Sequence, residues 1–234
     1  QQPTEHSLTP CLTKGFSPTL AQTPATTPQD SVPQIATIKT PYFEADVTAA
    51  PEMQPWGHTA EALCEVWYSK ISVMLKSDES FRPLPDTVKI IFDLESQAPA
   101  YVAGSTMHVS IPYVKGHLDD FGMIIHELTH LVQRYRGGAP GWLMEGMADY
   151  VRNKLFEPNL KLPKVNFDRA KYTDSYKTTA SFLLFVESKY GPDLIPKLHA
   201  AIRARMYKPE LFKELTGKDL DELWSAFKES QMGA

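Results

Sequence analysis

The sequence predicts an α+β protein in which a small mixed sheet and one buried helix make up the first part and helices make up the second. Two short segments, Thr87–Asp93 and residues 106–112, are rich in β-branched residues and are bounded by proline or glycine, which is typical of strands. From residue 141 onwards, apolar residues recur mostly every three or four positions. The strands therefore come early in the chain and helices dominate after them.

Length and composition indicate an ordinary globular protein. With 234 residues, of which 42% are apolar and 22% charged, the chain can bury one good core. We expect one domain over residues 36–234, with lobes at about 36–138 and 139–234. The formal charge of −4 and the pI near 6.0 give no basic surface for nucleic acid. No apolar run approaches the roughly twenty residues that cross a bilayer, so we expect no membrane as a partner. We also expect a monomer that binds no nucleic acid.

Residues 1–35 are rich in Pro, Thr, Ser and Gln and show no helical or strand periodicity. They predict an N-terminal extension, which could cover a cleft as a propeptide, although a surface tail is the simpler interpretation. Cys11 lies in this extension and Cys64 lies in a predicted helix. The two cysteines could form a disulfide in an exported protein, or stay as unpaired thiols.

Two further segments, residues 35–39 and Tyr42–Asp46, alternate weakly and could be strands. The spacing of apolar residues predicts a long helix over residues 56–76. A second helix should start near residue 119 or 120, where aspartates suit a helix N-terminus, and end at the glycines 137–138. After an irregular polar segment at 161–174, four more helical segments are predicted, at residues 176–187, 194–207, 210–215 and 219–231.

The predicted strand at residues 106–112 has one apolar and one polar face. Met107, Val109 and Ile111 alternate with polar residues, among them His108. We predict an edge strand beside a cleft, where an extended peptide can pair with the strand backbone. His108 is then expected to face solvent.

The helix around residue 126 carries the sequence His-Glu-Leu-Thr-His. At 3.6 residues per turn, His126 and His130 lie on one face, close enough to bind a single metal ion. Glu127 lies about 100° further round the helix, where it can act as a general base on water beside the metal. The neighbouring positions are apolar, so buried imidazoles there need partners, and metal supplies them. We expect zinc, which in catalytic sites usually has three protein ligands and one open position.

A third ligand must come from elsewhere in the chain. Residues 142–156 resume helical spacing, and Glu145 and Asp149 share one face of that helix. The connection between the helices is short, so the second can fold back and bring Glu145 to the metal. Asp149 can then accept a hydrogen bond from the outer nitrogen of a ligand histidine. Asp149 as the third ligand stays open as the alternative.

Residues 123–133 and 141–152 together resemble the basic secretory protein family, whose members are regarded as zinc peptidases of plants and bacteria. The resemblance extends from about residue 42 to 231 and includes residues 216–224. The family is similar to gluzincins, the zinc peptidases whose third ligand is a glutamate on a second helix. The resemblance implies a zincin fold, secretion with a signal peptide already removed, and hydrolysis of proteins. Two departures stand out, since the interval from His130 to Glu145 is shorter than in gluzincin aminopeptidases and the chain is mildly acidic.

The oxyanion that develops during hydrolysis needs a neutral hydrogen-bond donor. Tyr176 is the first candidate, because residues 176–184 resemble the segment in which gluzincin aminopeptidases carry their transition-state tyrosine. A tyrosine that merely caps the core is the alternative. Further candidates for the donor are Tyr172, His108 and His117.

The function predicted from these residues is a zinc-dependent peptidase that acts on protein or peptide substrates. Its water is activated by the metal, and Glu127 is the general base. The alternative is a secreted binding or defence protein that keeps the fold without catalysis. The intact Glu127 favours the enzyme.

Overall fold

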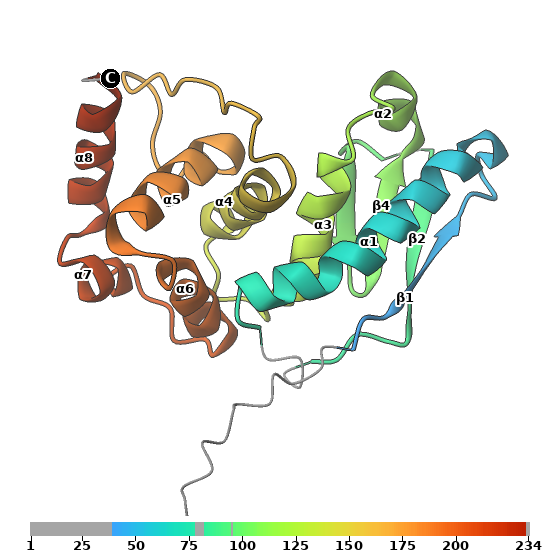
Figure 1. Cartoon of the computed structure of the whole chain (residues 1–234), viewed down its shortest axis with the longest axis horizontal. Helices are drawn as coiled ribbons and strands as arrows, with labels where there is room; N and C mark the ends of the chain where they lie inside the picture. Colours follow the sequence, from blue (N-terminus) through green and yellow to red (C-terminus); the bar gives the residue numbers. More distant parts are fainter. Residues whose placement is uncertain (1–38, 78–81, 95, 233–234) are drawn as a thin grey trace, which may run out of the picture. The chain divides into compact units, whose positions relative to one another are not determined.

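A computed structural model describes residues 39–77, 82–94 and 96–232. Strands and helices alternate in the first part of this range, and helices alone follow (Figure 1). The strands are β1 (Tyr42–Asp46), β2 (Thr87–Asp93), β3 (Ala100–Ala103) and β4 (Thr106–Ser110). The helices are α1 (Gln54–Met74, after a 3-10 turn Pro51–Met53), α2 (Ile111–Gly116), α3 (Gly122–Gln133), α4 (Gly141–Val151, running into a π-helical turn Arg152–Phe156), α5 (Tyr176–Tyr190), α6 (Leu194–Arg203), α7 (Leu211–Thr216) and α8 (Leu220–Met232).

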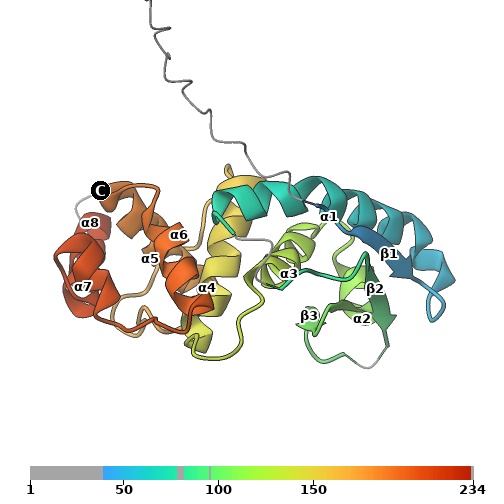
Figure 2. The same ribbon diagram turned by 90° about the horizontal axis from the view of Figure 1, so that it is seen from below.

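The four strands form one mixed sheet in the order β1-β2-β4-β3. Strands β1, β2 and β4 are parallel, and β3 pairs antiparallel with β4. Helices α1 and α3 contact each other and pack on the sheet, and Figure 2 shows α1 and α3 side by side. The α+β class and the small mixed sheet are therefore confirmed.

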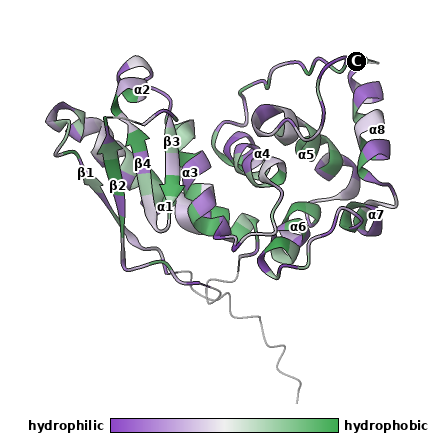
Figure 3. Ribbon diagram, turned by 180° about the vertical axis from the view of Figure 1, so that it is seen from behind, coloured by the Kyte–Doolittle hydropathy of each residue, from purple (hydrophilic) through white to green (hydrophobic). Residues whose placement is uncertain are grey.

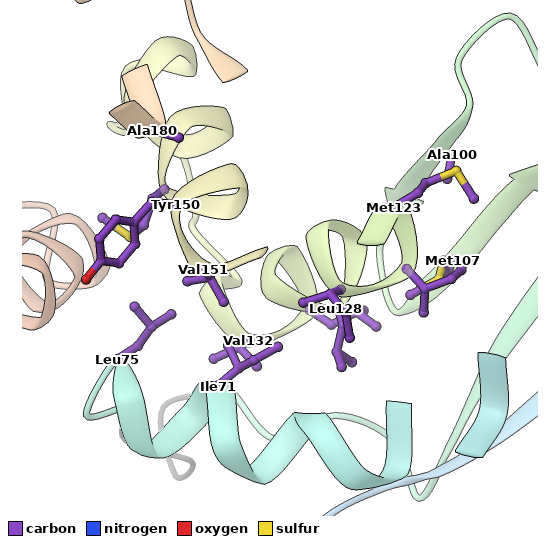
Figure 4. Packing of buried hydrophobic residues seen from close by; sticks show 14 of the residues in the cluster. Ile71, Leu75, Ala100, Met107, Met123, Leu128, Val132, Tyr150, Val151 and Ala180 are labelled. Atoms are coloured by element: carbon purple, nitrogen blue, oxygen red, sulfur yellow. The ribbon is translucent and has the colours of Figure 1, made fainter. Parts of the chain in front are cut away.

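The core lies where helices meet the sheet and one another. Figure 3 shows apolar residues along β2 and β4. Residues such as Ile90 and Met107 on these strands are fully buried. In Figure 4, Ile71 of α1 lies beside Val132 of α3, and Leu75 of α1 lies near Val151 of α4. The long helix α1 therefore supports both of the helices that carry the predicted site.

One strand prediction was wrong in its position. The strand at residues 106–112 is interior, because β4 lies between β2 and β3. The edge strand on that side is β3, whose few residues Ala100–Ala103 give too short a pattern to predict. The strand β4 also ends at Ser110, since Pro112 falls in the first turn of α2, where a missing N–H costs nothing.

Helix α3 begins close to the predicted position but ends earlier than predicted. At its start, Asp120 Oδ1 accepts a hydrogen bond from the Met123 amide at 3.3 Å. The helix ends at Gln133, several residues before Gly137, and Arg134 closes it in a left-handed conformation with φ 43°. Arg203 supplies donors to the last carbonyls, with 2.7 Å from Nη2 to Val132 O. Since side chains satisfy these carbonyls, the helix needs no glycine cap.

Helices α4 and α5 pack unusually closely at Gly146. A Cβ added there would lie 2.1 Å from Thr179 Cγ2 on α5. Glycine is thus the residue that allows this approach. The contact brings the start of α5 next to Glu145.

Several predictions fall on the N-terminal segment. The extension at residues 1–35 and nearly all of the possible strand at 35–39 lie outside the described residues, and the division of residues 36–234 into two lobes stays a prediction. Cys64 is a fully buried thiol. Cys11 lies outside the described residues, so its pairing with Cys64 stays a prediction. Among the described residues, no helix combines the length and apolar character needed to span a bilayer.

Candidate metal centre

A cavity of about 1080 Å³ lies between the edge of the sheet and the helices that follow it. Its walls come from β3, α3, α4 and the segment that enters α5. The predicted site residues that line it are His126, Glu127, His130, Glu145, Asp149 and Tyr176. The structure therefore brings all six together from three separate helices.

Three ligand atoms in this cavity form a nearly equilateral triangle. Nε2 of His126 lies 3.2 Å from Nε2 of His130 and 3.2 Å from Oε2 of Glu145. The third side, from His130 Nε2 to Glu145 Oε2, is 3.4 Å. Ligands at about 2.0–2.1 Å from a tetrahedral metal ion are about 3.3 Å apart. The three residues therefore form a candidate metal-binding group whose spacing fits a first-row divalent ion.

Asp149 lies behind this group. Its Oδ1 accepts a hydrogen bond from Nδ1 of His126 at 2.7 Å, and Asp149 is only 5% exposed. This bond orients the imidazole and turns Nε2 towards the cavity. Of the two acids left open by the sequence, Glu145 joins the metal-binding group and Asp149 supports a histidine from outside it.

A second support, Gln133, was missed by sequence reasoning. His130 Nδ1 donates to Gln133 Oε1 at 2.7 Å, and Gln133 Nε2 donates to the Met144 carbonyl at 3.1 Å. The side chain is fully enclosed and ties α3 to α4 beside Glu145. Its position three residues after His130 on one helix was the available signal.

The charges of the group are strongly coupled. Burial lowers the pKa of His126, but hydrogen bonds with Asp149 and Glu145 outweigh it and raise that pKa to about 9. Burial raises the pKa of Glu145, yet the hydrogen bonds from the two histidines bring it down to about 2. Without a metal ion, a proton on the imidazoles therefore neutralises Glu145.

Glu127 differs from Glu145 in having no positive partner at hydrogen-bond distance. It is 6% exposed, and its Oε2 has no hydrogen-bond partner among the described residues. Burial is the main cause that raises the pKa of this carboxyl group. A buried carboxylate oxygen without a partner is costly, and here it lines the cavity beside the histidines.

Tyr176 enters the site at the first residue of α5. Ser175 and Tyr176 both have positive φ, 66° and 45°, which is strained for residues other than glycine. The Tyr176 ring stacks on His126 with centroids 6.0 Å apart and 22° between the planes. Tyr176 is 54% exposed, and the charge of Glu145 is the largest cause that raises the pKa of its hydroxyl.

The other candidate donors are engaged elsewhere. Tyr172 packs against Trp142 and Phe182, and His117 stacks on Tyr113. His108 was expected to face solvent, but its side chain is only 22% exposed because Tyr101 stacks over it at 4.6 Å. None of these three candidates lines the cavity.

Comparisons with known proteins identify the family of the chain. No curated protein matches the chain. A solved structure described as a functionally unknown conserved protein from Bacillus anthracis str. Ames is similar, with a TM-score of 0.44 and 11% identity over 77% of this chain. This chain spans 46% of that protein's length. Residues 58–227, well over half of the sequence, match the family described as peptidases of plants and bacteria, and the chain therefore belongs to this BSP family.

Proposed function

We propose that this protein is a zinc-dependent peptidase with a gluzincin-like zincin fold that hydrolyses peptide bonds in proteins or peptides. One observation carries the proposal. The metal-binding triangle of His126, His130 and Glu145 lies in one cavity with the unpartnered carboxylate of Glu127. A structural zinc site would instead have four protein ligands and no catalytic carboxylate beside it.

The donor set fits zinc. Two imidazole nitrogens and one carboxylate oxygen are the ligands of many catalytic zinc sites, and they leave one position open. When bound, zinc would supply a Lewis acid that polarises the scissile carbonyl and lowers the pKa of water. Asp149 and Gln133 keep both imidazoles in the orientation that the ion requires.

Glu127 is the general base in this proposal. Its free oxygen accepts a proton from the attacking water and afterwards delivers it to the leaving amine. The pKa raised by burial suits a group that must both take up and release a proton. No covalent intermediate is required.

Tyr176 is proposed as the donor to the oxyanion. Its ring already lies against the proposed ligand His126, on a strained backbone with φ 45°. A hydroxyl with a raised pKa stays protonated and can donate.

The edge strand β3 is proposed to bind the substrate. It pairs with β4 along one side only, and residues 98–102 line the cavity. An extended peptide can add to such an edge through its backbone. The sequence predicted this role for residues 106–112. We propose it for β3 instead, because β3 and not β4 lies at the edge of the sheet.

Digestion of casein by zinc-loaded protein tests the proposal. We expect cleavage that stops on chelation and returns with zinc, and a Glu127→Gln variant that binds zinc but loses at least about a thousandfold in turnover. Absence of cleavage by a fully zinc-loaded protein across several unfolded substrates would instead favour the non-catalytic binding protein. Full activity of Glu127→Gln would remove Glu127 from the mechanism.

A further inference from the structure

The direction of strand β3, which borders the cavity, relates the two ends of the cavity to the two ends of helix α3. Figure 4 shows Ala100, the first residue of β3, beside Met123 near the start of α3. The last residue of β3, Ala103, pairs with Thr106, which also pairs with Lys89 near the start of β2. Strand β3 therefore runs in the same direction as α3, from the Met123 end of the cavity to the end where α3 finishes.

The end where α3 finishes is positively charged. Arg82 and Arg134 both line the cavity there, and Gln133 and Tyr135 beside them carry no formal charge. Within the described part of the chain, the side chain of Arg82 makes one hydrogen bond. Its Nη1 donates to the Arg134 carbonyl at 3.2 Å. A guanidinium has several further N–H donors in a fixed fork. Arg82 is thus anchored by one donor and keeps others for a ligand.

The opposite end of the cavity contains an ion-paired arginine, and the wall before α5 carries one charge of each sign. Arg152 donates from Nε to Glu157 at 2.7 Å and from Nη2 to Asp120 at 2.8 Å. On the wall before α5, Asp174 and Lys177 line the cavity together and carry opposite charges. Arg82, by contrast, is held through a backbone carbonyl and not through a carboxylate of the described residues.

We propose that Arg82 forms a subsite for a carboxylate side chain, so that the enzyme prefers peptides with glutamate or aspartate near the cleaved bond. Charge-assisted and bidentate hydrogen bonds are the strongest contacts that a guanidinium makes with a carboxylate. The inference rests on the proposed peptidase function and names its substrate class.

The side of the cleaved bond follows from strand pairing. A peptide that adds antiparallel to β3, the slightly more stable arrangement, runs from the Arg82 end of the cavity to the Met123 end. The residues that precede the scissile bond then lie at the Arg82 end. The acidic residue is therefore on the amino-terminal side of the cleaved bond.

The test begins with a mixed peptide library whose cleavage products are identified by mass spectrometry. One well-cleaved sequence is then synthesised with Glu, Gln or Lys at the preferred position. We expect kcat/KM for the Glu peptide to exceed that of the Gln peptide about tenfold. This ratio should fall towards one in Arg82→Gln and favour the Lys peptide in Arg82→Glu.

Arg205→Gln is the matched control. Arg205 Nη2 donates to the Arg136 carbonyl at 2.8 Å, in the same connection after α3, but it does not line the cavity. The Glu to Gln ratio should be unchanged in this variant. A wild-type ratio near one, or a ratio unchanged by Arg82→Gln, would overturn the subsite.

Binding of the same peptides to zinc-loaded Glu127→Gln protein, followed by fluorescence anisotropy, separates this proposal from the peptidase function. Tighter binding of the Glu peptide that depends on Arg82 supports the subsite even if the wild-type protein cleaves nothing. Equal binding of the Glu and Gln peptides overturns the subsite even if cleavage is found.

Discussion

Helix α3, which carries two of the proposed metal ligands, and the entrance to α5, which carries the proposed oxyanion donor, hold these side chains in opposite ways. Along α3, every residue from Gly122 to Leu128 is buried, the backbone is regular, and both histidines have a hydrogen-bonded support. At the entrance to α5, Ser175 and Tyr176 have positive φ and Tyr176 is more than half exposed. The proposed ligands are thus fixed by burial and hydrogen bonds, whereas the tyrosine lies on a strained backbone beside one close helix contact.

This difference follows from what each group has to do. Metal ligands must keep their mutual spacing within a few tenths of an ångström, and a packed helix provides that rigidity. A donor to the oxyanion must meet a substrate that enters and leaves, so an exposed position beside the cavity suits it. Strain of this kind persists only where the surrounding structure holds it, and here Thr179 against Gly146 does so.

A substitution at Gly146 tests the packing that positions the entrance to α5. A Gly146→Ala methyl would overlap Thr179 Cγ2 and Cβ, which lie 2.1 and 2.4 Å away. We expect a loss of about 2–3 kcal/mol in stability and more than about a hundredfold in kcat, because Tyr176 and Glu145 are displaced. Gly141→Ala is the control, since nothing lies within 4 Å of a Cβ there. Equal effects of the two variants in thermal unfolding and peptide cleavage would contradict the role of Gly146.

Removing only the Tyr176 hydroxyl should spare the fold. Tyr176→Phe is expected to lower kcat by about a hundredfold with KM, zinc content and Tm nearly unchanged, because the lost bond forms only in the transition state. Tyr172→Phe should leave kcat unchanged, since Tyr172 packs against Trp142 away from the cavity lining. A loss in Tyr172→Phe alone would transfer the role to Tyr172.

The supports of the two histidines can be weakened separately. Asp149→Asn replaces a charged acceptor at 2.7 Å from His126 and should lower zinc affinity about 10–100-fold. Gln133→Ala removes a neutral acceptor from His130 and should cost less, about tenfold. Competition with a chromogenic chelator measures both. A larger loss in Gln133→Ala than in Asp149→Asn would mean that the link to Met144 matters more than orientation of the imidazole.

His199, behind the end of α3, makes stability depend on pH. It is 1% exposed and lies between Tyr135 Oη at 2.8 Å and Ser77 Oγ at 2.9 Å. Burial, and then the charges of Arg203 and Arg134, lower its pKa from 6.5 to about 3. Between these values the unfolded chain binds one more proton than the folded chain. The contribution is therefore complete above pH 6.5 and is lost on acidification by about 1.4 kcal/mol per pH unit.

Urea unfolding at pH 7.0, 6.0 and 5.0 measures this slope. The difference between wild type and His199→Gln isolates His199 from other titrating groups such as His126. A His199→Gln protein is expected to be less stable at pH 7 but to lose less stability on acidification. Parallel pH profiles of the two proteins would contradict the assignment.

The parts of the fold with a regular period could be predicted from the sequence. Strand β2 and helix α1 were found nearly to the residue, because their apolar residues repeat over many positions. Strand β3 was missed, and β4 was placed at the edge, because four residues carry no pattern and strand order depends on long-range pairing. Helix α3 ended early because Arg203, distant in sequence, supplies the closing donors.

The same distinction holds for the site. His126, Glu127 and His130 could be predicted because their spacing on one helix sets their geometry. Glu145 was predicted as the third ligand with Asp149 as the alternative, because both lie on one face of α4. The packing of α4 against α3 places Glu145 in the triangle and Asp149 behind it. Gln133 was missed because its spacing of three residues from His130 is a weak signal, which many side chains on one helix share.

Titration of zinc into chelated protein, with metal content and peptide cleavage followed in the same samples, tests the central claim most directly. We predict that cleavage rises in proportion to bound zinc and stops rising at one ion per chain. In Glu145→Ala, which lacks one corner of the triangle, zinc affinity and cleavage should fall together. Wild-type affinity in Glu145→Ala, or cleavage that does not follow bound zinc, would contradict the account.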